Sequence, residues 1–276
     1  MKPTNKIIIY DDSCPMCSVY TKAFVRTGFI TQEGRKSFSN IDAEILEQID
    51  NYKCRNKIPL IDTSNNSVKY GIDALLEILN EKIPLIKTIG TFKPVNRFLK
   101  KLYNLISLNR RVITASKLNS NGFDCTPDFN LKYRLLFLFL GLSFNTIMLI
   151  PEFSNVLSKS AFNNTSPAKL QSAHFALVLV NVALALKISG RKAIEFLGQI
   201  NVLALLTTLL LLPLCLFNSL FNIPATINDV LLLILFLFIL TEYKRRMKFA
   251  GILTNKIIVT VNLISTILFL SYLIMG

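Results

Sequence analysis

The chain has 276 residues, of which 51% are hydrophobic, and a formal net charge of +14 at pH 7. This length predicts two domains, and five cysteines argue against a secreted disulfide scaffold. The basic residues cluster beside apolar runs and not in patches interleaved with aromatic residues, so the charge indicates membrane topology and argues against a nucleic-acid partner.

The first predicted elements are a short strand and a helix that carries two cysteines. Residues 7–10 are apolar and predict a buried strand, residues 11–13 are of types that cap helices, and Pro15 suits a first helical turn. Cys14 then lies at a helix N-terminus, which stabilises a thiolate, and Cys17 lies one turn further. A strand followed by Cys-x-x-Cys and a helix is typical of a thioredoxin-like redox motif.

Two other interpretations of the cysteine pair remain open at this point. Cys14 and Cys17 can be half of a metal site, or two inert structural cysteines. Cys54 and Cys125 are candidates for additional redox partners, whereas Cys215 lies in an apolar run and is expected to be packed as a small hydrophobe.

The next elements complete a small α/β domain. Residues 37–41 predict a second strand, and Asp42 caps a helix. Residues 57–62 and 67–70 flank an Asn-containing turn and predict a β-hairpin, after which residues 71–73 open another helix. The predicted order is β-α-β-α-β-β-α.

This order resembles the thioredoxin fold, with a spacing close to that of glutaredoxins. Glutaredoxins carry a Val-Pro pair before strand three and Gly-x-Asp at the start of the last helix, and Ile58-Pro59 and Gly71-Ile72-Asp73 are similar to these motifs. More closely, Asp11-x-x-Cys14-x-x-Cys17 resembles the DCC family of predicted thiol-disulfide oxidoreductases. Further matches to that family are Tyr70-Gly71-x-Asp73-Ala74 and Asn109-Arg110.

The resemblance implies roles for four residues besides the cysteines. It implies that Ile58 and Pro59 lie beside the cysteines and position a bound peptide or glutathione. It also implies a cis bond between them, and an ordinary trans proline at a strand start is the alternative. It implies that Asp73 binds a free amino group or caps its helix, and that Asp11 exchanges a proton with Cys17 or caps its helix; capping is the simpler role for both. A carboxylate near the first cysteine would also raise its pKa.

Two segments follow the predicted α/β domain. Residues 92–112 form a basic amphipathic helix, expected to pack on the domain, with an anionic membrane surface as the alternative partner. Residues 116–131 are polar and predict a linker. The predicted organisation is therefore a thioredoxin-like domain at 1–115, a linker at 116–131 and an all-α transmembrane domain at 132–276.

Five apolar segments in residues 132–276 are long enough to span a bilayer. They are Tyr133–Ile150, Leu170–Ile188, Ala193–Phe217, Ile227–Tyr243 and Ile257–Met275. Ten basic residues flank one side of these spans, whereas only Lys159 and Lys169 lie in loops on the other. The positive-inside rule then predicts a multi-pass protein of the cell membrane with its N-terminal domain in the cytoplasm and its C-terminus outside.

Polar residues within the predicted spans are expected to form hydrogen bonds between helices. They are His174, Asn145, Asn181, Asn201 and Asn262. One histidine does not make a metal or haem site, so we predict no metal and no cofactor.

The sequence thus predicts a membrane-anchored thiol-disulfide oxidoreductase of the protein-disulfide reductase type. Cys14 attacks a disulfide of a protein or of a small thiol such as glutathione, and Cys17 resolves the mixed disulfide. The lipid bilayer is the second partner, and no nucleic acid is expected. Two alternatives are a metal-handling module that passes a soft cation to the membrane domain and a transporter or scaffold regulated by its redox domain.

Overall fold

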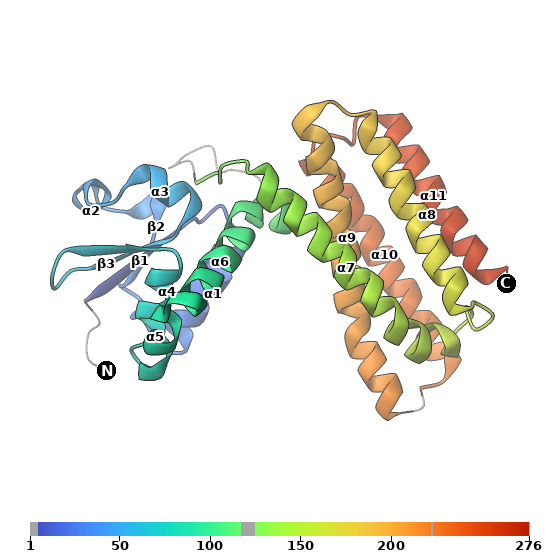
Figure 1. Cartoon of the computed structure of the whole chain (residues 1–276), viewed down its shortest axis with the longest axis horizontal. Coiled ribbons are helices and arrows are strands. Elements are labelled where there is room, and N and C mark those ends of the chain that lie inside the picture. Colours follow the sequence, from blue (N-terminus) through green and yellow to red (C-terminus); the bar gives the residue numbers. More distant parts are fainter. Residues whose placement is uncertain (1–4, 117–124, 222, 276) are drawn as a thin grey trace. The chain divides into compact units, whose positions relative to one another are not determined.

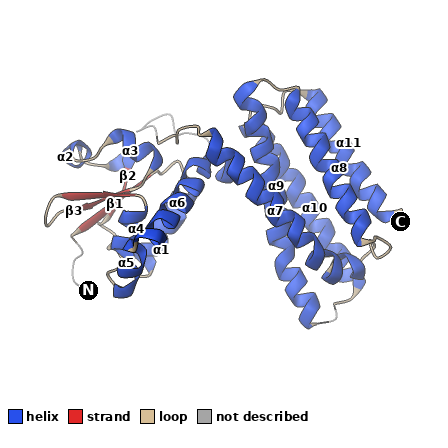
Figure 2. Cartoon of the chain, in the orientation of Figure 1, coloured by secondary structure: helices blue, strands red, loops and turns tan. Residues whose placement is uncertain are grey.

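The computed structural model describes residues 5–116, 125–221 and 223–275, and the chain divides into two compact units, 1–134 and 135–276 (Figure 1). The first unit contains a small sheet surrounded by helices, and the second contains helices (Figure 2). The predicted fold class, a mixed α/β region followed by a helical region, is confirmed.

The strand predicted at residues 37–41 is wrong over most of its length, because the second strand ends at Ser37 and Phe38–Asn40 form a 3-10 helix. The N-terminal unit otherwise contains its helices and strands in the predicted order. They are β1 (Lys6–Tyr10), α1 (Pro15–Arg26), β2 (Arg35–Ser37), α2 (Ala43–Glu47), α3 (Asn51–Asn56), β3 (Pro59–Asp62), β4 (Ser67–Tyr70), α4 (Ile72–Leu79), α5 (Pro84–Thr91) and α6 (Lys93–Thr114). The helix predicted after Asp42 is α2. Helix α3 was not predicted, and it begins because the Asp50 carboxylate accepts the backbone N–H groups of Tyr52 and Lys53.

The four strands form one mixed sheet in the order β2-β1-β3-β4. β1 is parallel to β2 and antiparallel to β3, and β3 and β4 form the predicted hairpin. Successive side chains of a strand point to opposite faces. Ile8 accordingly packs with side chains of α1 and α4, whereas Ile9 packs on the other face with Cys54 of α3 and with Cys125.

The long helix α6 packs one side against the sheet domain. Tyr103 accepts a hydrogen bond at its hydroxyl from the backbone N–H of Ile58, at 2.9 Å, and Ser107 donates to the carbonyl of Asn56. Gly71 has φ +63°, and a Cβ at that position would lie 3.1 Å from Cε1 of Tyr103. Glycine is therefore required where β4 turns into α4 beneath this helix.

The Ile58–Pro59 bond is trans, so the expectation of a cis bond is wrong. Pro59 is the first residue of β3 and is aligned with Tyr70 of β4. A trans proline is readily accommodated at a strand start, where its missing N–H removes no bond from the ladder.

The second unit contains five helices that are long and apolar enough to cross a membrane, as predicted. They are α7 (Leu131–Asn155), α8 (Pro167–Leu186), α9 (Gly190–Leu220), α10 (Ala225–Phe249) and α11 (Lys256–Ile274). Asn262 donates to the side-chain oxygen of Asn181 at 2.6 Å, and Asn201 donates to the carbonyl of Phe137. These bonds join α11 to α8 and α9 to α7, which confirms the predicted hydrogen bonding between helices for these asparagines.

Candidate functional site

The turn between β1 and α1 is organised by Asp11. Its Oδ1 accepts hydrogen bonds from the backbone N–H of Ser13 at 3.0 Å and from the Ser13 hydroxyl at 2.5 Å. The N-cap of α1 is Cys14, whose Sγ accepts the backbone N–H of Cys17 at 3.4 Å. The prediction that residues 11–13 cap the helix is therefore wrong, because the Asp11 carboxylate is used inside the preceding turn and the cap is the sulfur itself.

The pKa values of the two cysteines at the start of α1 shift in opposite directions. The Cys17 thiol donates a hydrogen bond to the Cys14 sulfur, and this, against the effect of burial, lowers the pKa of Cys14 to about 7. The same shared proton and burial raise the pKa of Cys17 far above that of an ordinary thiol. Cys14 is therefore the cysteine of the pair that ionises to a thiolate, and it lies at the position that the sequence predicts for a nucleophile.

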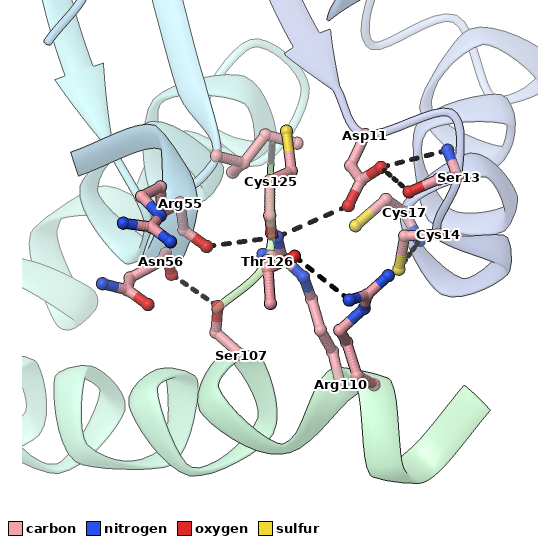
Figure 3. Close-up of polar contacts among 12 residues, drawn as sticks. Asp11, Ser13, Cys14, Cys17, Arg55, Asn56, Ser107, Arg110, Cys125 and Thr126 are labelled. Atoms are coloured by element: carbon pink, nitrogen blue, oxygen red, sulfur yellow. Dashed lines mark hydrogen bonds and ion pairs between the residues drawn. The ribbon is translucent and has the colours of Figure 1, made fainter. Parts of the chain in front are cut away.

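A buried arginine lies beside this pair. Arg110 of α6 is only 5% exposed, and its Nη2 lies 3.5 Å from Oδ2 of Asp11 and donates to the carbonyls of Arg55, at 3.1 Å, and Cys125 (Figure 3). Three separate segments therefore hold one guanidinium in place. Its positive charge lowers the pKa of Cys14, whereas the negative charge of Asp11 raises it.

Residues 125–128 form a segment that lies against α3 and α6. Arg111 donates to the hydroxyl of Thr126 at 3.1 Å. Asn56 and Asp128 exchange two hydrogen bonds, at 2.6 and 2.9 Å. These residues fall in the predicted linker 116–131, of which 117–124 lie outside the described residues, and they contact the α/β unit directly.

A cavity of about 240 Å³ opens beside the second cysteine. Cys17 is part of its lining, together with apolar and aromatic side chains from both helices that flank it. Its lining includes Asp11, Tyr20, Cys54, Ile58, Tyr103 and Arg110. Burial raises the pKa of Tyr103 to about 12, so its hydroxyl stays neutral in the physiological range.

The structure brings some of the predicted site residues together and separates others. Asp11, Cys14 and Cys17 share one turn, and Ile58 lines the adjacent cavity, with Pro59 next to it in β3. Asp73 lies apart from the cavity lining: its carboxylate is 3.2 Å from the ammonium of Lys100 and 3.4 Å from the Asn96 amide. No side-chain hydrogen bond caps α4.

Three residues that complete the site had no predicted role. Arg110 appeared only as part of a family motif, and Tyr103 only as an apolar position of an amphipathic helix. Cys125 contributes a backbone carbonyl, for which a sequence carries no signal. Each contact joins segments that are far apart along the chain.

Cys54 and Cys125 are buried thiols on the face of the sheet that packs against α3. Burial raises the pKa of Cys54 to about 12 and shifts the pKa of Cys125 in the same direction. Both therefore remain protonated at neutral pH and are poor nucleophiles. Among the residues that the structure describes, no group of three or more His, Cys, Asp or Glu side chains is arranged to hold a metal ion.

The lowered pKa of Cys14 predicts a specific pH profile. The rate of its alkylation by iodoacetamide is expected to rise with pH and to be half-maximal at a pH of about 7, because the thiolate is the reactive form. In a Cys17→Ala variant the thiol donor is absent, so the midpoint moves to higher pH. Mass spectrometry of the modified peptide across a pH series measures both midpoints, and equal midpoints in the two proteins would contradict this account.

Comparison with known proteins finds a match in the N-terminal region. Residues 8–116 match the family model described as DCC1-like thiol-disulfide oxidoreductase. No curated protein and no solved structure matches the chain. The matched segment runs from β1 through the end of α6, so it includes both cysteines, Asp11 and Arg110.

Proposed function

We propose, on the premise that residues 8–116 belong to the DCC1-like thiol-disulfide oxidoreductase family, that the chain is a membrane-anchored reductase of disulfides. The observation that carries the proposal is the geometry of the cysteine pair at the start of α1, where the Cys14 sulfur caps the helix and accepts the backbone N–H of Cys17 at 3.4 Å. This arrangement agrees with a lowered pKa for Cys14 and a raised pKa for Cys17. A nucleophile and a protonated partner one helical turn apart are what a dithiol mechanism needs.

The reaction proceeds in two exchange steps. The Cys14 thiolate attacks one sulfur of the substrate disulfide, the substrate S–S bond breaks, and the other substrate sulfur leaves as a thiolate. Cys17 then loses its proton and attacks the Cys14 sulfur, which releases the second substrate thiol. The protein is left with a Cys14–Cys17 disulfide, so two electrons have passed from the dithiol to the substrate.

Asp11 is the proposed acceptor of the Cys17 proton. Its carboxylate lines the same cavity as Cys17 and is fixed on one side by Ser13 and on the other by Arg110. Such a carboxylate accepts a proton from a neighbouring thiol without a change of conformation. Arg110 is a positioning residue, which holds Asp11 and adds positive charge beside the thiolate.

The substrate is proposed to be a disulfide of a protein or of a small thiol such as glutathione. Ile58 and the aromatic residues of the cavity would contact its apolar parts. The N–H of Ile58 donates to Tyr103, and its carbonyl accepts from Gly71, so the backbone of Ile58 is already engaged inside the domain. Recognition therefore rests on the cavity side chains more than on the backbone at Pro59.

Stoichiometric electron transfer tests this function. The reduced full chain in detergent is mixed with a peptide that contains one disulfide. Mass spectrometry is expected to find one new disulfide per chain, between Cys14 and Cys17, and one reduced peptide. A pair that stays reduced while the peptide stays oxidised would overturn the proposal.

The proposed orientation places the α/β unit in the cytoplasm, where thiols are kept reduced and the net reaction is reduction. The orientation rests on a count of the basic residues that flank the predicted spans: ten lie on one side of the membrane and two on the other. A topology reporter fused after Gly276 is expected to report an exterior location. A cytoplasmic signal from that reporter would contradict the orientation.

A further inference from the structure

One surface of the α/β unit is apolar and carries no partner within the described residues. Between residues 5 and 116, nine large apolar side chains are exposed, and six of them lie on α5, on α6 or at the turn between them. These six, called the α5–α6 face below, are Leu85, Ile89, Phe92, Phe98, Leu102 and Ile106. Phe98 keeps 64% of its surface exposed, which is unusual for a phenylalanine of a water-soluble domain.

This face is distinct from the side of α6 that packs on the domain. Phe98, Leu102 and Ile106 are spaced by four residues and so form one stripe along the helix. Ser107 and Arg110 are buried on the side that meets the α/β unit. The expectation that this helix packs on the α/β domain therefore holds for one side of α6. The exposed stripe on the other side needs a different partner.

The charge beside the stripe identifies that partner as an anionic surface. The chain contains no Asp or Glu from Lys82 to Phe123, and nine Lys and Arg residues lie in that stretch. Lys100 is paired with Asp73, but Lys93, Arg97 and Lys101 make no ion pair among the described residues. Apolar side chains bordered by unpaired basic ones fit a bilayer, with acyl chains under the stripe and anionic head groups around the ammonium and guanidinium groups.

The covalent connection tethers the α/β unit to helices that are able to cross a bilayer. α6 ends at Thr114, and the first helix capable of crossing a membrane, α7, begins at Leu131. A short tether makes docking an intramolecular event with a high effective concentration, so a modest affinity is sufficient. A soluble protein partner would have no such advantage.

We propose that the α5–α6 face docks on the anionic lipid leaflet into which the helices of residues 131–274 insert. Ile106 belongs both to this face and to the lining of the cavity beside Cys17. A docked unit therefore holds the cavity at the lipid surface. The proposal depends on the five membrane-capable helices but not on the thiol chemistry.

The absence of tryptophan from the chain makes a direct test possible. Phe98→Trp places a single tryptophan on the α5–α6 face, and Leu85→Trp, in a separate variant, places one at an independent position of the same face. Tyr52→Trp on α3 is the matched control, because Tyr52 is 70% exposed and lies outside the face. Each full-length variant is reconstituted in vesicles of phosphatidylcholine and phosphatidylglycerol, with or without bromine on the acyl chains.

Docking on lipid predicts blue-shifted emission and strong quenching by brominated lipid for Phe98→Trp and Leu85→Trp, with neither effect for Tyr52→Trp. Red-shifted, unquenched emission from the two face reporters would show that the face is in water and would overturn the proposal. Blue-shifted but unquenched emission would show that protein covers the face, which also overturns it. Equal quenching of Tyr52→Trp would show that lipid contact is not specific to the α5–α6 face, which would also contradict the proposal.

The electrostatic part of the proposal has its own test. Combining Lys93→Gln, Arg97→Gln and Lys101→Gln with the Phe98→Trp reporter is expected to weaken docking on the order of 100-fold. Quenching by brominated lipid should fall accordingly. The Phe98→Trp reporter with its basic residues intact should lose a similar amount of quenching in vesicles of phosphatidylcholine alone. Quenching that is unchanged in both experiments would contradict a role for anionic lipid.

Discussion

The Cys14→Ser variant is expected to lose all disulfide reduction, whereas Cys17→Ser is expected to accumulate a covalent adduct with its substrate. A hydroxyl in place of the Cys14 thiolate cannot attack a disulfide at neutral pH. With Cys17 replaced, the first exchange step still occurs, but the mixed disulfide on Cys14 is not resolved. Non-reducing electrophoresis and mass spectrometry of the full chain after mixing with a peptide disulfide measure both outcomes.

The matched control for these variants is Cys54→Ser. Cys54 is a buried thiol that lines the same cavity but has a raised pKa, so its loss is expected to leave electron transfer intact. Full activity in Cys14→Ser, or an adduct on Cys54 in place of Cys14, would show that the nucleophile is assigned to the wrong residue.

Replacement of Arg110 by Gln is expected to affect both stability and acidity. The guanidinium is buried, and removal of one partner of a buried ion pair costs about 3–5 kcal/mol of folding free energy. The Asp11 carboxylate then acts on Cys14 without its counter-charge, so the pKa of Cys14 rises and its thiolate forms at higher pH. Thermal denaturation measures the first effect, and the pH profile of Cys14 alkylation measures the second.

Arg111→Gln is the control for Arg110→Gln, since the neighbouring guanidinium binds Thr126 and not Asp11. We expect the alkylation midpoint of Arg111→Gln to equal that of the unmodified chain. Arg110→Lys retains the positive charge but not the planar guanidinium. In this variant the pKa of Cys14 is expected to stay partly lowered. If Arg110→Gln alters stability but leaves the midpoint in place, Arg110 has only a structural role.

Local features of the fold followed from the sequence because short-range physics determines them. The two short runs that flank the Asn-containing turn predicted the β3–β4 hairpin, and runs of about 20 apolar residues predicted the five long helices. The position of Cys14 at the mouth of α1 followed from the strand before it and from Pro15 after it. The identity of the cap did not follow, because the backbone of the turn decides that Asp11 accepts the Ser13 N–H while the Cys14 sulfur accepts the Cys17 N–H.

The surroundings of the cysteines could not be derived in the same way. Arg110 meets Asp11 across 99 positions of the chain, and it also binds carbonyl groups of Arg55 and Cys125, whose residue type is irrelevant to the contact. The trans bond before Pro59 is another such case, because the isomer depends on how β3 is seated against its neighbours. Long-range packing, and not local preference, sets these features.

The most direct test of the account is a redox titration of the full chain in glutathione buffers, scored by alkylation of Cys14 and Cys17. The two cysteines are expected to form one intramolecular disulfide with a potential near or below about −200 mV, in the range of dithiol reductants. A pair that stays reduced across the whole range, or that only a bound metal protects from alkylation, would contradict a thiol-disulfide oxidoreductase.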